Sequence, residues 1–253
     1  ERIGGMKLLA LDTPDGKLRP EQIDREVWGW GDEHRAQPLV VSITQSTELG
    51  TNYSPEEVRA ISDTAHAQGM HVHLDGSRIA NAAASLGVPL RAFTTDAGVD
   101  VISLGGTKNG ALGAEAIVVL RTEASEGLRY LRKLNMQLGS KQRFASAQLI
   151  ALFEGELWRD SASHANAMAT RLRAALVDAA ATGRLSFTQA TESNAVFARL
   201  PFAAAETLRA RFGFYDWAGP FTDGTVEVRW MCSWDTTTDD VDAFAEAITA
   251  ALA

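Results

Sequence analysis

The feature that most constrains the fold is an alternation of short apolar runs with stretches of helical periodicity in the first half of the chain. The apolar runs have the composition of buried strands and span residues 39–43, 70–74, 99–104 and 116–120. The clearest helix start follows the first run, because Ser54 can cap the helix, Pro55 fits its first turn and Glu57 completes a capping box. Strands joined by helices of this length need crossover connections. The pattern therefore predicts an α/β core, with a mostly parallel sheet and helices on both faces.

The segment before this core contributes two further predictions. A strand is predicted at residues 6–11 and a short helix at residues 20–27, where acidic residues occupy the first turns. The chain begins at Glu1 rather than at Met, and no tail or capping helix precedes the predicted strand. We therefore expect that sequence is missing upstream.

The second half of the chain predicts a long helix followed by a small α+β domain. Residues 123–181 are mainly helical in pattern and rich in alanine, and the apolar positions of a long amphipathic helix are Leu157, Ala165, Met168, Leu172 and Leu176. Beyond them, strands are predicted at residues 185–188, 195–200 and 225–231, and helices at residues 203–212 and 239–252. We therefore expect two domains, a large α/β portion over residues 1–155 and a linking helix with a small α+β domain over residues 156–253.

Composition narrows the function classes. The net charge of −8 argues against binding to nucleic acid or to an anionic membrane surface. No apolar run approaches the roughly 18 residues that a membrane-spanning helix needs. Cys232 is the single cysteine, so an internal disulfide framework is excluded and a reducing compartment is favoured. We expect a cytoplasmic globular protein.

Two charged residues are expected at the same edge of the sheet. Asp75 ends the run at residues 70–74, and Lys108 follows the run at residues 99–104 within a glycine-rich loop. Ligands of open α/β sheets bind outside the carboxyl ends of the strands. A lysine there can form an imine with an aldehyde, of which pyridoxal phosphate is the common example, and a fixed carboxylate stabilises its protonated pyridine nitrogen.

Two other interpretations of these residues stay open on spacing alone. One is an ordinary Asp–Lys ion pair at the edge of the sheet. The other is a loop that cradles nucleotide phosphates, although the loop lacks the Gly-x-x-x-x-Gly-Lys-Ser/Thr spacing and the chain has no Gly-x-Gly-x-x-Gly fingerprint.

The sequence around these two residues resembles the threonine aldolase and β-eliminating lyase family of pyridoxal-phosphate enzymes. The resemblance lies in residues 71–82 (HVHLDGSRIANA) and 103–110 (SLGGTKNG), in the same order and at the same separation. It runs from about Ile3 to the C-terminus and is especially close to the low-specificity L-threonine aldolase branch. It implies the aspartate-aminotransferase-like fold, called fold type I, with active sites at a dimer interface, so a homodimer or homotetramer is expected. Members also have an N-terminal segment that carries the phosphate-binding loop, and nothing before Ile3 can supply it.

The resemblance also implies a set of site residues. Lys108 matches the family's Schiff-base lysine, and Asp75 matches the partner of the pyridine nitrogen. Thr107 would lie close to the cofactor. Arg78 matches an arginine that contacts the bound amino acid, and Arg229 looks like the arginine that clamps its carboxylate.

The local pattern gives Arg229 some independent support. Val226, Val228 and Trp230 alternate onto one face of a strand, which leaves Arg229 on the other face. A guanidinium placed there could bind a carboxylate in a bidentate manner. The alternative is a solvated arginine on an edge strand.

Glu48 and His73 complete the candidate site. Many threonine aldolases carry a histidine near the position of Glu48, so this carboxylate is expected either to do acid–base work at the substrate's β-hydroxyl or only to order its loop. His73 precedes Asp75 by two residues and should lie on the same strand face, where it is expected to order the site rather than react. The histidines form no recognisable zinc motif, so no catalytic metal is expected.

The resulting hypothesis is a carbon–carbon lyase. It would bind a β-hydroxy-α-amino acid as an external aldimine and break the Cα–Cβ bond in a retro-aldol step, so that threonine gives glycine and acetaldehyde. Two alternatives remain: a β-eliminating lyase that uses the same cofactor, and a non-catalytic remnant of the fold.

Overall fold

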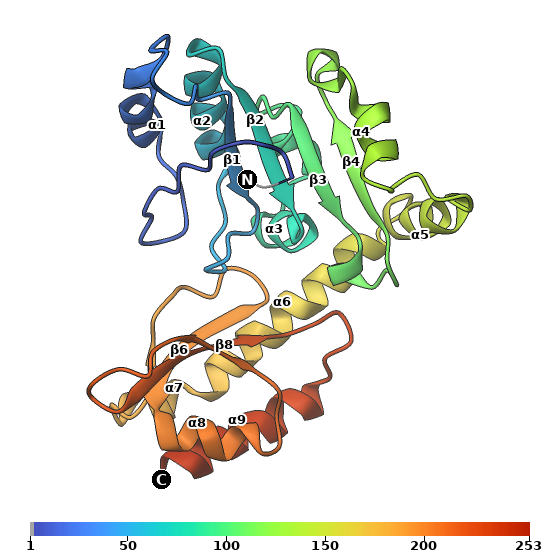
Figure 1. The fold of residues 1–253 in the computed structure, drawn as a ribbon. Coiled ribbons are helices and arrows are strands. Elements are labelled where there is room, and N and C mark those ends of the chain that lie inside the picture. Colours follow the sequence, from blue (N-terminus) through green and yellow to red (C-terminus); the bar gives the residue numbers. More distant parts are fainter. Residues whose placement is uncertain (1–2) are drawn as a thin grey trace.

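The computed structural model describes residues 3–253, except for the side chains of residues 124 and 125. Its strands form two separate four-stranded sheets (Figure 1). The first sheet has the order β1-β2-β3-β4, and its strands are β1 (Val40–Thr44), β2 (His71–Gly76), β3 (Val101–Gly105) and β4 (Glu115–Val119). The first three strands run parallel, and β4 is antiparallel to β3. The predicted α/β class with a mostly parallel sheet is confirmed.

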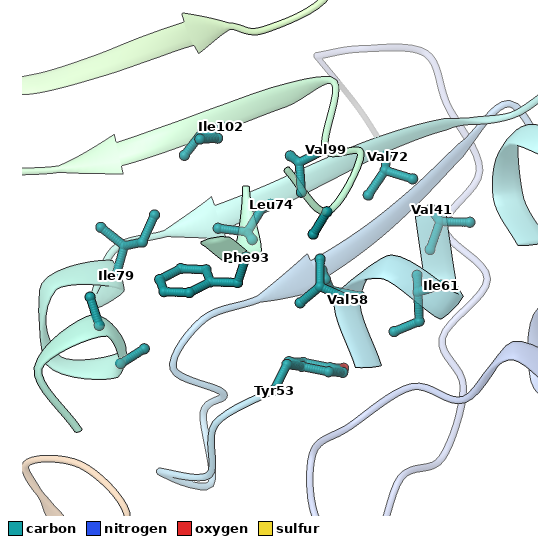
Figure 2. Close-up of a cluster of buried hydrophobic side chains, with 14 of the residues drawn as sticks. Val41, Tyr53, Val58, Ile61, Val72, Leu74, Ile79, Phe93, Val99 and Ile102 are labelled. Atoms are coloured by element: carbon teal, nitrogen blue, oxygen red, sulfur yellow. The ribbon is translucent and has the colours of Figure 1, made fainter. Parts of the chain in front are cut away.

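One face of this sheet is buried under helices because its strands alternate between apolar and polar side chains. Val72 and Leu74 of β2 are fully buried, whereas His73 and Asp75 between them point to the opposite face and are half-buried. Figure 2 shows the buried cluster, in which β-strand residues meet Val58 of α2 (Pro55–Ala67). Each such side chain contributes about 1.5–3 kcal/mol on burial. The packing therefore fixes which strand residues face away from the helices, toward the candidate site.

The predicted capping box of α2 is present. The Ser54 hydroxyl accepts a hydrogen bond from the Glu57 backbone N–H, and the Glu57 carboxylate accepts one from the Ser54 backbone N–H. The other helical segments of this part are α1 (Pro20–Glu26), η1 (Val27–Gly29), α3 (Ile79–Leu86), η2 (Leu90–Phe93), η3 (Thr107–Asn109), η4 (Thr122–Ser125), α4 (Leu128–Leu134) and α5 (Arg143–Phe153).

The prediction of a strand at residues 6–11 is wrong. This segment forms no strand in the described residues, and Met6, Leu8 and Leu9 are exposed. β-propensity measures how well a side chain fits a paired, half-buried surface, and in the described part of the chain residues 6–11 pair with no strand of either sheet.

The second sheet, with the order β5-β6-β8-β7, forms the C-terminal part together with the helices that pack on it. All of its pairings are antiparallel. Its elements are α6 (Leu157–Ala175), α7 (Val177–Ala181), β5 (Ser186–Phe187), β6 (Ala195–Pro201), α8 (Phe202–Arg209), β7 (Tyr215–Ala218), β8 (Thr225–Met231) and α9 (Thr238–Leu252). Helix α6 runs from the first sheet to the second (Figure 1).

Each sheet has its own apolar core, and α6 contributes to both. Trp158 and Ala162, near the start of α6, belong to the core of the first sheet. Met168 and Leu172, further along, belong to the core of the second. The division of the chain after residue 155 stays a prediction, and these cores are compatible with it. Among the described residues, no helix combines the length and the apolar character needed to cross a bilayer.

Candidate active site

Asp75 and Lys108 lie at the carboxyl ends of adjacent parallel strands. Asp75 pairs with Ser103 in the register of β2 and β3, and β3 ends at Gly105, just before the turn that holds Lys108. The chain passes close to β2 at this point, since a Cβ on Gly105 would lie 2.8 Å from the Ser77 Cα. The structure therefore brings the predicted acid and the predicted amine to one edge of the sheet.

The ion-pair interpretation of these two residues finds no support. No salt bridge joins Asp75 to Lys108 within residues 3–253, and the Lys108 side chain is exposed. The neighbouring Thr107 is also exposed, and its backbone N–H donates to Glu115 Oε1 at 3.1 Å.

Among the described residues, hydrogen bonds hold only one of the two carboxylate oxygens of Asp75. Its Oδ1 atom accepts hydrogen bonds from the Ser77 backbone N–H at 2.9 Å and from Ser77 Oγ at 2.5 Å. No described residue donates to its Oδ2 atom. An oriented carboxylate with a free oxygen suits a protonated pyridine nitrogen, so these residues fit pyridoxal phosphate.

The His73 side chain lies on the same face of the sheet as Asp75 and contacts the strands on both sides of β2. Its Nδ1 is 2.9 Å from Ser42 Oγ of β1, and its Nε2 is 2.9 Å from Ser103 Oγ of β3. Burial lowers the pKa of His73, and the nearby charge of Asp75 opposes this shift only in part. A neutral imidazole fixed on both ring nitrogens is suited to ordering the site.

Three further predicted residues, far apart in the sequence, meet in one ion-pair cluster. Arg229 Nη1 of β8 lies 2.7 Å from Glu48 Oε2, and Arg78 Nη1, just before α3, lies 3.6 Å from Glu48 Oε1. The two arginine side chains are only 18% and 12% exposed, whereas that of Glu48 is 55% exposed. The cluster therefore consists of two nearly buried cations and one accessible carboxylate.

The surroundings of the two guanidinium groups hold Arg229 in place and perturb Arg78. Arg229 Cζ lies 4.9 Å from the centre of the Trp217 ring, which belongs to the paired strand β7. Burial lowers the pKa of Arg78, and the charge of Arg229 lowers it further, whereas Glu48 raises it. The two cations are thus close enough to repel each other, and an anion between them relieves this repulsion.

The sequence reasoning missed two supporting residues. Ser77 orients Asp75, and its position two residues after an aspartate is the spacing of local side-chain-to-backbone turns, so it could have been found. Trp217 packs on Arg229 from β7, a strand that was not predicted because it is short, largely exposed and interrupted by a register shift.

Comparisons with known proteins place this chain in a family. The model of the beta-eliminating lyase family matches residues 1–200. The low specificity L-threonine aldolase of Pseudomonas aeruginosa is 41% identical over 96% of this chain and 68% of its own length. The enzyme of the same name from a Pseudomonas sp. strain is 39% identical over 98% of this chain and 70% of its own length.

A solved structure extends the agreement to the fold. The threonine aldolase of Leishmania major superposes with a TM-score of 0.91 at 29% identity, covering 100% of this chain and 72% of that one. The fold is therefore that of the type I pyridoxal-phosphate enzymes, and pyridoxal phosphate is the cofactor of the family. The chain belongs to the beta-eliminating lyase family, as the residues around Asp75 and Lys108 predicted.

Proposed function

We propose that this chain cleaves L-threonine and related β-hydroxy-α-amino acids between Cα and Cβ to give glycine and an aldehyde. The observation that carries the proposal is the convergence at one sheet edge of a carboxylate with a free oxygen, Asp75, and an exposed amine, Lys108. The two Pseudomonas relatives are named for threonine cleavage, and their similarity covers nearly the whole chain.

Five residues are proposed to contact the cofactor: Lys108, Asp75, Thr107, His73 and, as described below, Arg78. Lys108 would hold it through its side-chain amine, and the free oxygen of Asp75 would stabilise its protonated ring nitrogen. Thr107 lies beside Lys108, and His73 lies on the strand face of Asp75. When bound, pyridoxal phosphate supplies an electron sink for the pair released as the Cα–Cβ bond breaks.

The two arginines are proposed to orient the substrate. Arg229 binds the substrate carboxylate, and Arg78 contacts both this carboxylate and the cofactor. Their nearly buried, planar guanidinium groups suit bidentate binding. Holding the carboxylate would fix the orientation of the substrate's Cα–Cβ bond in the site, which is a positioning effect.

Glu48 is proposed to take the proton of the β-hydroxyl group. Its carboxylate is exposed and contacts both arginines, which are the groups proposed to bind the substrate's carboxylate. Proton transfer to Glu48 would leave the β-oxygen free to form the aldehyde carbonyl.

The decisive experiment combines product analysis with labelling. Cofactor-loaded protein should release acetaldehyde and glycine from L-threonine. An α-keto acid and ammonia would indicate β-elimination instead, which the description of the family model also allows. Borohydride reduction followed by peptide mass mapping should place the cofactor mass on Lys108.

Two variants sharpen the labelling test. Lys108→Ala should lose labelling and lower kcat by about a thousandfold or more. Lys7→Ala, which removes another exposed lysine, should keep both. Label on any other lysine would refute the site, and failure to bind the cofactor would favour a non-catalytic remnant.

The assembly and compartment are also proposals. We propose a homodimer or homotetramer in the cytoplasm with an amino acid as its small-molecule partner. The net charge of −8 and the single cysteine support this environment.

A further inference from the structure

The charge of the Glu48–Arg78–Arg229 cluster is not balanced. Two guanidinium groups share one carboxylate, so these three side chains carry a net charge of +1, and Asp75 is a further anion whose charge acts on Arg78. Both oxygens of Glu48 are in use, because Oε2 meets Arg229 and Oε1 meets Arg78. Glu48 therefore sits between the arginines much as a free carboxylate would.

Glu48 is the member of this cluster that can move. The arginines are nearly buried, and Arg229 also packs on Trp217. The backbone around Glu48 is anchored, since the Gly50 N–H donates to the Thr47 carbonyl at 3.0 Å. The Glu48 side chain is more than half exposed, so it can rotate into solvent without disturbing packed groups.

A second carboxylate would compete with Glu48 for the same donors. Two carboxylates that face one pair of cations repel each other, and the accessible one is the easier to displace. The Glu48 side chain is more than half exposed, so solvent weakens its ion pairs, and Glu48 can occupy the arginine pair in the free protein and still yield to a ligand.

We propose that Glu48 is a resident carboxylate that occupies the arginine pair in the free protein and that the substrate's carboxylate displaces it. This inference rests on the proposed function, in which the same arginines bind the substrate. Displacement moves the Glu48 carboxylate off the cations only when a substrate is present. The proposed base therefore becomes available at the moment when a β-hydroxyl group lies beside it.

The test measures carboxylate binding without turnover. ¹³C-labelled acetate is titrated into the cofactor-loaded protein at constant ionic strength, and line broadening gives its affinity. Acetate has no amine, so it cannot react as a substrate. Glu48→Gln removes the resident charge and should bind acetate about threefold to tenfold more tightly than the unsubstituted protein.

Control variants separate competition from a general charge effect. Glu156→Gln also removes an exposed glutamate that pairs with an arginine, Arg159 at 3.0 Å, and should leave acetate affinity unchanged. Arg229→Met should abolish acetate binding. Circular dichroism spectra and thermal melts of each variant verify that it folds.

Two outcomes of the acetate titration would overturn the inference. Equal or weaker acetate binding by Glu48→Gln would mean that Glu48 does not compete for the arginines. Absence of acetate binding in both proteins would mean that the arginine pair is not a carboxylate site. Threonine cleavage is measured separately, so tighter acetate binding without acetaldehyde release would refute the proposed function and leave the competition intact.

Discussion

Ser77 donates two hydrogen bonds to a single oxygen of Asp75, one from its backbone N–H at 2.9 Å and one from its Oγ at 2.5 Å. The carboxylate is thereby held with its other oxygen free of protein donors in the described residues. A fixed acid of this kind stabilises a ring cation better than a mobile one, because its orientation is set before the ligand arrives.

Removing the Ser77 hydroxyl should therefore weaken cofactor binding. Ser77→Ala keeps the backbone N–H bond and loses the Oγ bond, a loss worth about 1 kcal/mol, or about a fivefold higher Kd for pyridoxal phosphate. An absorbance titration measures it, with the exposed Ser163→Ala as the control. Unchanged affinity in Ser77→Ala would show that the hydroxyl does not orient Asp75.

Arg229 should affect substrate binding more than the chemical step. Arg229→Lys keeps the charge but loses the planar, bidentate guanidinium, so KM for threonine should rise about tenfold with a smaller change in kcat. Arg199 offers a matched control on the paired strand β6, because it binds Asp223 at 2.7 Å and lies 4.2 Å from the Phe221 ring centre. If Arg199→Lys raised KM equally, the effect would belong to the sheet and not to the site.

Asp100 should be essential for stability rather than for activity. It is buried just before β3, accepts a hydrogen bond from the Val72 N–H at 2.6 Å and lies 2.9 Å from His66 Nε2. Asp100→Ala leaves these groups without their partner and should lower the free energy of unfolding by about 3 kcal/mol. Urea denaturation measures the loss. The exposed Asp63→Ala should change stability by about 0.5 kcal/mol or less, and a similar small change in Asp100→Ala would contradict the prediction.

Glu57 should account for part of the acid sensitivity of the fold. Burial alone raises the pKa of Glu57, but hydrogen bonds from Lys17 and from the Ser54 N–H outweigh burial and lower the pKa below its ordinary value. A carboxyl group with a depressed folded pKa stabilises the fold above its unfolded pKa. This contribution is lost as the pH falls through the folded pKa.

The corresponding measurement is the urea midpoint between about pH 7 and about pH 3. Glu57→Gln should be less stable at neutral pH and should lose less stability on acidification than the unsubstituted protein. Glu21→Gln, at an exposed position of α1, should follow the unsubstituted protein. Parallel pH curves for Glu57→Gln and the unsubstituted protein would exclude this role.

The elements with strong local signals were predicted from the sequence. The capping residues of α2 and the apolar runs of β1, β2 and β3 encode their own backbone conformation, so these elements lie close to their predicted positions. The crossover rule then places Asp75 and Lys108 at one edge, because the carboxyl ends of parallel strands meet there.

Where local signals are weak, the sequence did not predict the secondary structure correctly. Residues 6–11 have the composition of a strand but form none, and β7 forms although its residues do not alternate cleanly. In both cases the outcome depends on whether a neighbouring strand offers backbone partners, and composition does not report this.

The sequence by itself determined the α/β class, the order of the elements with strong local signals and the two segments that carry the acid and the amine. Only the tertiary structure decided that Glu48 meets Arg229 across 181 positions and that the same carboxylate reaches Arg78. Sequence patterns record the preferences of neighbouring residues, whereas contacts between distant side chains arise from the packing of whole elements. For this reason the carboxylate between two arginines was visible only in the folded chain.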